Sequence, residues 1–232
     1  MADQLFKKRR AKKAAELSRQ QAKRESYDKV LIVCEGTKTE PNYVNEIKDE
    51  LKLSTANVSI APSPGSDPLS VVEHAETLVN LQARQKHLDN YDRVFCVFDK
   101  DEHEEHGNRY SKALSKISQI KIKGVTFAAI TSNPCFEVWP VLHFERRTAP
   151  FLPTSKRTAA QEVAHHLSQY LPDYEKGRQG LYSQIKGQTK QAITFAKRLE
   201  HENQKSGSDN PSTQMHVLVD YLYKLKWGEI AR

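Results

Sequence analysis

The stretch Val30-Leu31-Ile32-Val33-Cys34-Glu35-Gly36 decides the fold, because five apolar residues run directly into an acid and a glycine. A second stretch, Val94-Phe95-Cys96-Val97-Phe98-Asp99-Lys100-Asp101, repeats the pattern about 60 residues later. Apolar runs of this kind predict strands that are buried on both faces, as in parallel sheets. Open α/β sheets bind their ligands at the carboxyl ends of such strands, where both runs of this chain become acidic.

The acids after the two strands are Glu35, Glu40, Asp99 and Asp101. Four carboxylates at one sheet edge indicate a site for a hard cation, Mg²⁺ or Mn²⁺, that acts on phosphate. Asp99 and Asp101 alternate, so both point to one side of an extended segment, although a polar loop end has the same pattern. Glu40 precedes Pro41 at an expected helix start, where an acid also favours the helix dipole without any metal.

Strands alternate with helices as far as residue 130, which predicts an α/β fold with a parallel four-stranded sheet and flanking helices. We expect strands at about 29–34, 57–61, 92–98 and 125–130, and helices at about 40–53, 68–87 and 108–119. Helices alone are expected afterwards, at about 136–144, 156–169, 178–202 and 212–226. The predicted organisation is a basic arm (1–28), an α/β domain (29–145) and a helical C-terminal region (146–232) packed on it.

The composition favours a cytoplasmic protein. No apolar run approaches the roughly 20 residues of a membrane span, and the charged N-terminus lacks the apolar core of a signal peptide. The three cysteines, Cys34, Cys96 and Cys135, lie in or beside apolar segments and are expected to be reduced core thiols. The oligomeric state is left open, and a homo-oligomer is compatible with the sequence.

The positive charge is concentrated in the first 29 residues, which hold ten Lys and Arg against four Asp and Glu, or +6 of the net +7. Such an arm can bind nucleic acid by neutralising phosphates, or it can be a solvated tail that aids solubility. The residues predicted to contact nucleic acid are Lys7, Lys8, Arg9, Arg10, Lys12 and Lys13. Lys176 and Arg178, in a segment bounded by glycines, are further candidates.

A third polar block, residues 132–139, follows the last expected strand and should reach the same sheet edge. Asn133 is expected to cap the next helix while facing the crevice. Glu137 is a candidate metal ligand or an ordinary acid in the first turn of a helix. His143 lies off the face of Glu137 and is expected to be structural. The segment 210–213 (Asn-Pro-Ser-Thr) is expected to start the last helix.

Glu-Gly after one buried strand and Asp-x-Asp after another resemble the Toprim arrangement. Five motifs in order narrow this to a resemblance to the RloB family over about residues 29–226: VCEGTKTEPNY (33–43), VFDKD (97–101), SNPCFEVW (132–139), HF (143–144) and NPST (210–213). Members of that family are similar to Toprim nucleases and are typically encoded beside an ABC-type ATPase in loci linked to phage defence.

The resemblance implies a Toprim- or Rossmann-like sheet and a Mg²⁺- or Mn²⁺-dependent nuclease, a hydrolase that cleaves DNA or RNA as the effector of an ATPase-coupled antiviral system. It implies catalytic roles for Glu35, Glu40, Asp99 and Asp101, metal ligation by Glu35, Asp99, Asp101 and Glu137, and supporting or substrate contacts from Lys38, Asn133, His143, Asn210, Ser212 and Thr213. Two alternatives remain: a non-catalytic nucleic-acid-binding adaptor of the ATPase, and a phosphoryl enzyme for small molecules.

Overall fold

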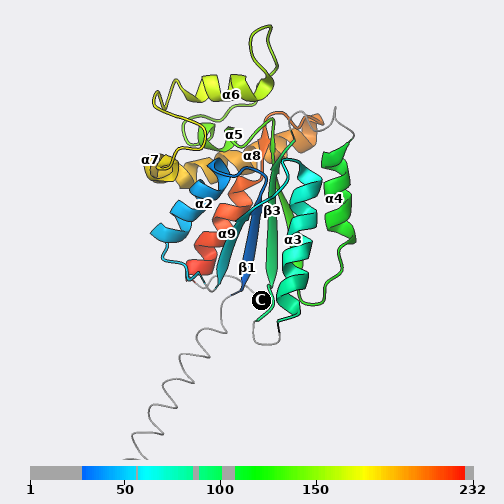
Figure 1. Cartoon of the computed structure of the whole chain (residues 1–232). Coiled ribbons are helices and arrows are strands. Elements are labelled where there is room, and N and C mark those ends of the chain that lie inside the picture. The colour runs from blue at the N-terminus through cyan, green and yellow to red at the C-terminus, as the bar shows by residue number, and fades with distance from the viewer. Residues whose placement is uncertain (1–27, 56, 86–88, 101–107, 228–232) are drawn as a thin grey trace, which may run out of the picture.

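The computed structural model describes residues 28–55, 57–85, 89–100 and 108–227 (Figure 1). Its elements, in chain order, are β1 (Val30–Cys34), α2 (Thr39–Glu50), β2 (Val58–Pro62), α3 (Pro68–Ala83), β3 (Arg93–Asp99), α4 (Arg109–Gln119), β4 (Thr126–Asn133), α5 (Val138–Val141), α6 (Ala159–Leu167), α7 (Leu181–Ile185), the 3₁₀ helix η1 (Lys186–Gln188), α8 (Thr189–Ser206), β5 (Ser212–Thr213) and α9 (Met215–Trp227).

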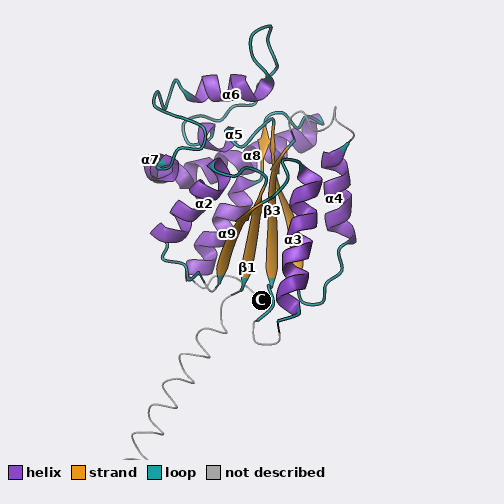
Figure 2. Ribbon diagram, viewed as in Figure 1, coloured by secondary structure: helices purple, strands orange, loops and turns teal. Residues whose placement is uncertain are grey.

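The described strands form one sheet in the order β2-β1-β3-β4-β5 (Figure 2). The first four are parallel, which confirms the predicted α/β class, and β5 runs antiparallel to β4. The prediction of a four-stranded sheet was therefore wrong, because the sheet has a fifth strand, β5. Ser212 and Thr213 pair with Asn133 and Ser132 instead of starting the last helix, which begins at Met215.

Alternation along the central strands builds two hydrophobic cores, because successive side chains of a strand point to opposite faces of the sheet. Val30, Ile32 and Cys34 of β1 pack with α2 and α9 on one face. Leu31 and Val33 pack with α3 and α4 on the other. The helices accordingly lie on both sides of the sheet in Figure 1. The apolar residues of both central strands, 30–34 and 94–98, are all buried, as their uninterrupted apolar sequences predicted, whereas Arg93 and Asp99 at the ends of β3 are partly buried.

The C-terminal helices extend one of these cores instead of forming a separate one. Leu181, Leu199 and Leu222, from three different helices, belong to the same buried cluster as the residues of α2 and β1. A smaller cluster joins α6 to α5 through Val163, Leu167 and Val138. The C-terminal region is thus continuous with the α/β unit, and residues in its loops can reach the edge of the sheet.

Two helix predictions need correction. The expected helix at 178–202 is three pieces, α7, η1 and α8, and the last piece continues to Ser206. Gly187 lies in the 3₁₀ turn, where its lack of a side chain weakens regular helix. The expected helix at 136–144 is regular only over Val138–Val141, and its ends are turns whose hydrogen bonds span three residues, such as His143 N–H to the Pro140 carbonyl.

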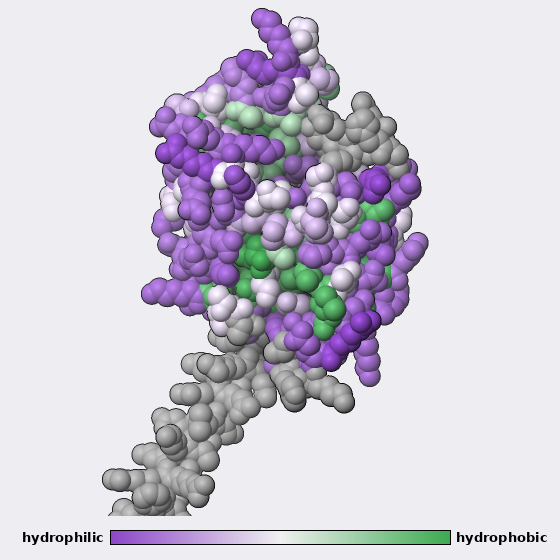
Figure 3. Space-filling view, viewed as in Figure 1, coloured by the Kyte–Doolittle hydropathy of each residue, from purple (hydrophilic) through white to green (hydrophobic). Residues whose placement is uncertain are grey.

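The surface seen in Figure 3 is mostly hydrophilic, with hydrophobic groups scattered mainly over its lower half. None of the helices in the described part of the chain is long and apolar enough to cross a membrane.

Candidate functional site

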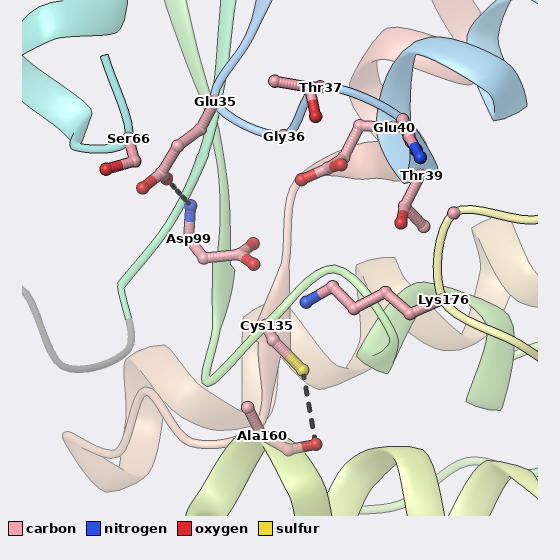
Figure 4. A pocket seen from close by; sticks show the side chains of 12 residues that line it. Glu35, Gly36, Thr37, Thr39, Glu40, Ser66, Asp99, Cys135, Ala160 and Lys176 are labelled. Carbon is pink, nitrogen blue, oxygen red and sulfur yellow. Dashed lines mark hydrogen bonds between the residues drawn. The ribbon is translucent and has the colours of Figure 1, made fainter.

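Three of the predicted acids converge at the carboxyl edge of the sheet. Glu35 follows β1, Asp99 ends β3, and Glu40 lies in the first turn of α2. All three line one pocket of about 570 Å³ (Figure 4). The parallel pairing of β1 with β3 explains this convergence, because both strands end at the same edge of the sheet.

Backbone hydrogen bonds hold the first two acids together. The Glu35 N–H donates to the Val97 carbonyl at 2.9 Å, which continues the strand pairing past the end of β1. The Asp99 N–H donates to Glu35 Oε2 at 3.1 Å (Figure 4). The carboxylate of Glu35 is therefore oriented by the backbone that carries Asp99, and the two side chains face the same pocket.

Gly36 makes room for Glu40. A Cβ atom at Gly36 would lie 2.0 Å from Glu40 Oε2 and 2.6 Å from its Cδ, so only glycine fits beside this carboxylate in its present position. Glu40 is only 6% exposed, although it belongs to a first helical turn where an acid could remain in solvent. The Glu-Gly pair after β1 thus serves a packing purpose that the sequence pattern does not reveal.

Glu137 is the fourth acid of the cluster and is almost fully buried, at 1% exposure. Its Oε1 accepts a hydrogen bond from the Tyr174 hydroxyl at 2.8 Å and lies 3.8 Å from the Lys176 ammonium nitrogen. Tyr174 and Lys176 belong to the loop between α6 and α7. The helical C-terminal region therefore contributes a hydroxyl and a cation to the acidic site.

The four acids repel one another. Burial, followed by the charges of Glu40, Glu137 and Glu35, holds the pKa of Asp99 well above its ordinary value. Burial is also the main cause that raises the pKa of Glu40, with smaller contributions from Glu137 and Glu35. The charge of Glu137 raises the pKa of Lys176, so the lysine stays protonated. A cation in the pocket would relieve this repulsion.

The chemistry of the donors fits Mg²⁺ or Mn²⁺, because every acid of the cluster offers only oxygen ligands. Within the described ranges, no three His, Cys, Asp or Glu side chains are grouped so that they could hold a metal ion as they stand. Mg²⁺ usually needs only one or two protein carboxylates, with water and substrate phosphates as its other ligands. Glu35 and Asp99, which are linked through the Asp99 N–H, are the pair best placed to supply them.

The predicted supporting residues are divided between the pocket and its surroundings. Lys38 lines the pocket. The other five residues do not line it and instead make contacts within the surrounding strands, helices and loops: Asn133, His143, Asn210, Ser212 and Thr213. Asn133 ends β4 and does not cap α5, whose cap position is Glu137, so that prediction was wrong. The cause is the strand pairing of Asn133 with Ser212, which keeps it extended. His143 is buried, and its Nδ1 is 3.0 Å from the Trp139 carbonyl oxygen.

The segment 210–213 fastens the C-terminal region to the sheet. Asn210 exchanges two hydrogen bonds with the backbone of Phe151, at 3.0 and 2.9 Å. The Thr213 hydroxyl lies 3.0 Å from that of Ser132 and accepts the Met215 N–H at 3.2 Å. These contacts are structural.

Two groups of predictions lie outside the described residues: Asp101, and the basic side chains of Lys7, Lys8, Arg9, Arg10, Lys12 and Lys13. Sequence reasoning missed Tyr174 and the pocket-lining roles of Cys135 and Ser66. Tyr174 stands in no motif. The block 132–139 that contains Cys135 and the helix expected from about residue 68, just after Ser66, were visible in the sequence, but their position beside Glu35 and Asp99 depends on tertiary structure.

Residues 30–222 match the model of a family described as RloB-like protein. A search of curated proteins found no match, and a search of solved structures found none either.

Proposed function

The chain belongs to the RloB-like protein family, and we propose that it is a metal-dependent nuclease that hydrolyses phosphodiester bonds in DNA or RNA. The observation that carries the proposal is the convergence of Glu35, Glu40 and Asp99 on one pocket, with the buried Glu137 close enough for its charge to raise the pKa of Asp99. Buried acids that repel one another are costly in a folded protein, and perturbed carboxyl groups of this kind cluster at functional sites.

The roles of the acids follow from their positions. Glu35 and Asp99 would hold Mg²⁺ or Mn²⁺, together with Asp101 and with Glu137 assisting. When bound at such a site, the ion neutralises phosphate charge and makes a bound water more acidic. Attack of water oxygen on phosphorus then breaks the bond to the leaving oxygen. Glu40, or Glu35 where it does not hold the ion, accepts the proton of the water, and the carboxyl group so protonated can return this proton to the leaving oxygen. Burial raises the pKa of Glu40, which favours its taking up the proton.

The cellular setting extends this proposal. We place the protein in the cytoplasm as the effector of an antiviral defence system, with an ABC-type ATPase as the partner that controls cleavage. The basic arm would add phosphate contacts to those of the pocket. Activity of the isolated protein is expected to be low if the ATPase controls access to the site.

Cleavage assays with Mn²⁺ test the proposal directly. The substrates are tRNA, mRNA, plasmid and single-stranded DNA, each incubated with and without the ATPase. Glu40→Gln should abolish cleavage, whereas Glu50→Gln, on the same helix but in a surface ion pair with Lys186, should leave it unchanged. Equal activity of the two variants would contradict the proposed role of Glu40.

Metal binding separates the nuclease from the alternatives. Titration calorimetry should detect Mn²⁺ binding by the wild-type chain, and Asp99→Asn should weaken it. A chain that binds polynucleotide but neither Mn²⁺ nor Mg²⁺ would instead be an adaptor of the ATPase. A chain that binds the metal but ignores all four polynucleotides would point to a small phosphorylated substrate.

A further inference from the structure

Lys176 occupies an unusual position for a surface lysine. It lines the same pocket as Glu35, Glu40 and Asp99, and Figure 4 shows its ammonium group pointing into the pocket toward Asp99. The side chain is 67% exposed, so the long methylene chain can move while its end reaches a buried acid, Glu137. A cation directed at a cluster of acids is suited to a negative ligand that must approach them.

The loop that carries Lys176 is fixed against α2. The Asn42 side-chain amide donates to the Gly177 carbonyl at 3.0 Å. Glu46 accepts the backbone N–H groups of Gly180 and Tyr182 at 2.6 and 3.0 Å. Since α2 also carries Glu40, one helix positions both an acid and the cation of this site.

Gly177 brings this loop close to the start of α2. Its φ is +85°, which other residues rarely adopt, and a Cβ there would lie 3.2 Å from Lys38 Cβ. The residue after Lys176 therefore combines a left-handed backbone with a close approach to the pocket wall. The placement of Lys176 is a built feature of the loop.

The contacts of Glu137 allow the lysine to leave. Glu137 Oε1 is hydrogen-bonded to the Tyr174 hydroxyl at 2.8 Å and is farther, at 3.8 Å, from the lysine nitrogen. If the ammonium group moves to another anion, the buried carboxylate keeps a hydrogen-bond donor, which limits the cost of the exchange.

We propose that Lys176 is the phosphate-binding cation of the site, moving from Glu137 to a phosphate oxygen of the bound strand. The inference rests on the proposed function, because it names the group that lets a polyanion approach four carboxylates. A phosphodiester carries one negative charge, and the lysine both pairs with that charge and reduces the repulsion from the acids.

Binding measurements with Lys176→Met test this inference, and Arg178→Met is the matched control, since it removes one positive charge from the same loop. Fluorescence anisotropy follows a labelled single-stranded oligonucleotide, as DNA and as RNA, with Ca²⁺ in place of Mn²⁺ to keep the strand intact. The binding constant K falls as salt increases, and each lost phosphate contact makes this dependence shallower. Lys176→Met should therefore reduce the magnitude of the slope of log K against log salt by about 0.7. Arg178→Met should leave the slope unchanged, and Lys176→Arg should restore it. Equal losses in the two Met variants, or no loss in Lys176→Met, would overturn the inference.

Cleavage with Mn²⁺ provides the second measurement. Because the contact between Lys176 and the phosphate is expected to persist in the transition state, kcat/KM should fall more for Lys176→Met than for Arg178→Met. If the wild type cleaves no strand either with or without the ATPase, the proposed nuclease fails while the binding comparison still decides the role of Lys176. If the wild type cleaves and Lys176→Met matches it in slope and kcat/KM, only the inference about Lys176 fails.

Discussion

Gly36→Ala is the perturbation whose effect can be worked out most directly from the structure. The new Cβ would stand 2.0 Å from Glu40 Oε2, whereas ordinary van der Waals contact begins at 3.4 Å. The Glu40 carboxylate must therefore move by about 1.4 Å. The φ of Gly36 lies outside the left-handed range, so alanine brings no backbone strain there.

We expect this displacement to impair function far more than stability. A misplacement of about 1 Å at a reaction site can cost about 100-fold in rate, or about 2.7 kcal/mol in the activation barrier. Gly→Ala at a compatible backbone position gains about 0.4–1 kcal/mol from the unfolded state, which offsets the movement of a flexible side chain. At this chain length 1 kcal/mol corresponds to about 2–4 °C, so the melting temperature should change by only a few degrees.

The assay pairs Mn²⁺-dependent cleavage with thermal unfolding, and calorimetry follows Mn²⁺ affinity. Gly187→Ala is the control, because a Cβ there meets nothing within 4 Å. It should leave cleavage and metal affinity unchanged. A folded Gly36→Ala protein with wild-type turnover and wild-type Mn²⁺ affinity would refute the reasoning, because the position of the Glu40 carboxylate would then not matter.

Three further predictions concern stability and the arm. Burial and neighbouring acids raise the pKa of Asp99, so the charged form of this residue destabilises the folded state at high pH. Asp99→Asn removes that charge and should raise the melting temperature of the metal-free protein at pH 8. Calorimetry should show this gain shrinking as pH falls through the raised pKa, because Asp99 then becomes protonated and neutral in the wild type. Tyr43→Phe leaves the buried Trp139 Nε1–H without its acceptor at 2.7 Å and should lower the free energy of unfolding in urea by about 1–3 kcal/mol, while an unchanged midpoint would contradict this. Deleting residues 1–26 should preserve the fold of the remaining chain, as measured by circular dichroism. It should reduce the magnitude of the slope of log K for nucleic-acid binding against log salt by about 0.7 to 0.9 per lost phosphate contact. An unchanged slope would exclude contact between the arm and the substrate.

The sheet was predictable because local patterns determine most of it. Apolar runs at 30–34 and 94–98 needed burial on both faces, and Asp67-Pro68 marked a helix start, where Asp67 accepts the N–H groups of Leu69 and Ser70. The fifth strand was not predictable in this way. Its two residues, Ser212 and Thr213, lie in the segment that was expected to start the last helix, and they form a strand only because they pair with β4.

The residues of the site likewise differ in whether local sequence patterns could predict them. Glu35, Glu40 and Asp99 could be proposed from sequence because each stands at a strand end or a helix start, where topology limits its position. Tyr174 and its contact with Glu137 could not, because the two residues are 37 positions apart and meet only after α5 and α6 have packed. Hydrogen bonds from a loop to a buried acid leave no periodic pattern in the sequence.

This division explains why the C-terminal region is integral to the site. The α/β unit alone would present four acids with mutual repulsion and would line the pocket with the cation of Lys38, too little positive charge to balance them. The loop between α6 and α7 adds Lys176 and the hydroxyl of Tyr174, and α2 fixes that loop through Asn42 and Glu46. A chain cut after residue 145 would lose this cation, together with the helices that complete one of its two cores. The balance of charge in the pocket is therefore a property of the whole described chain.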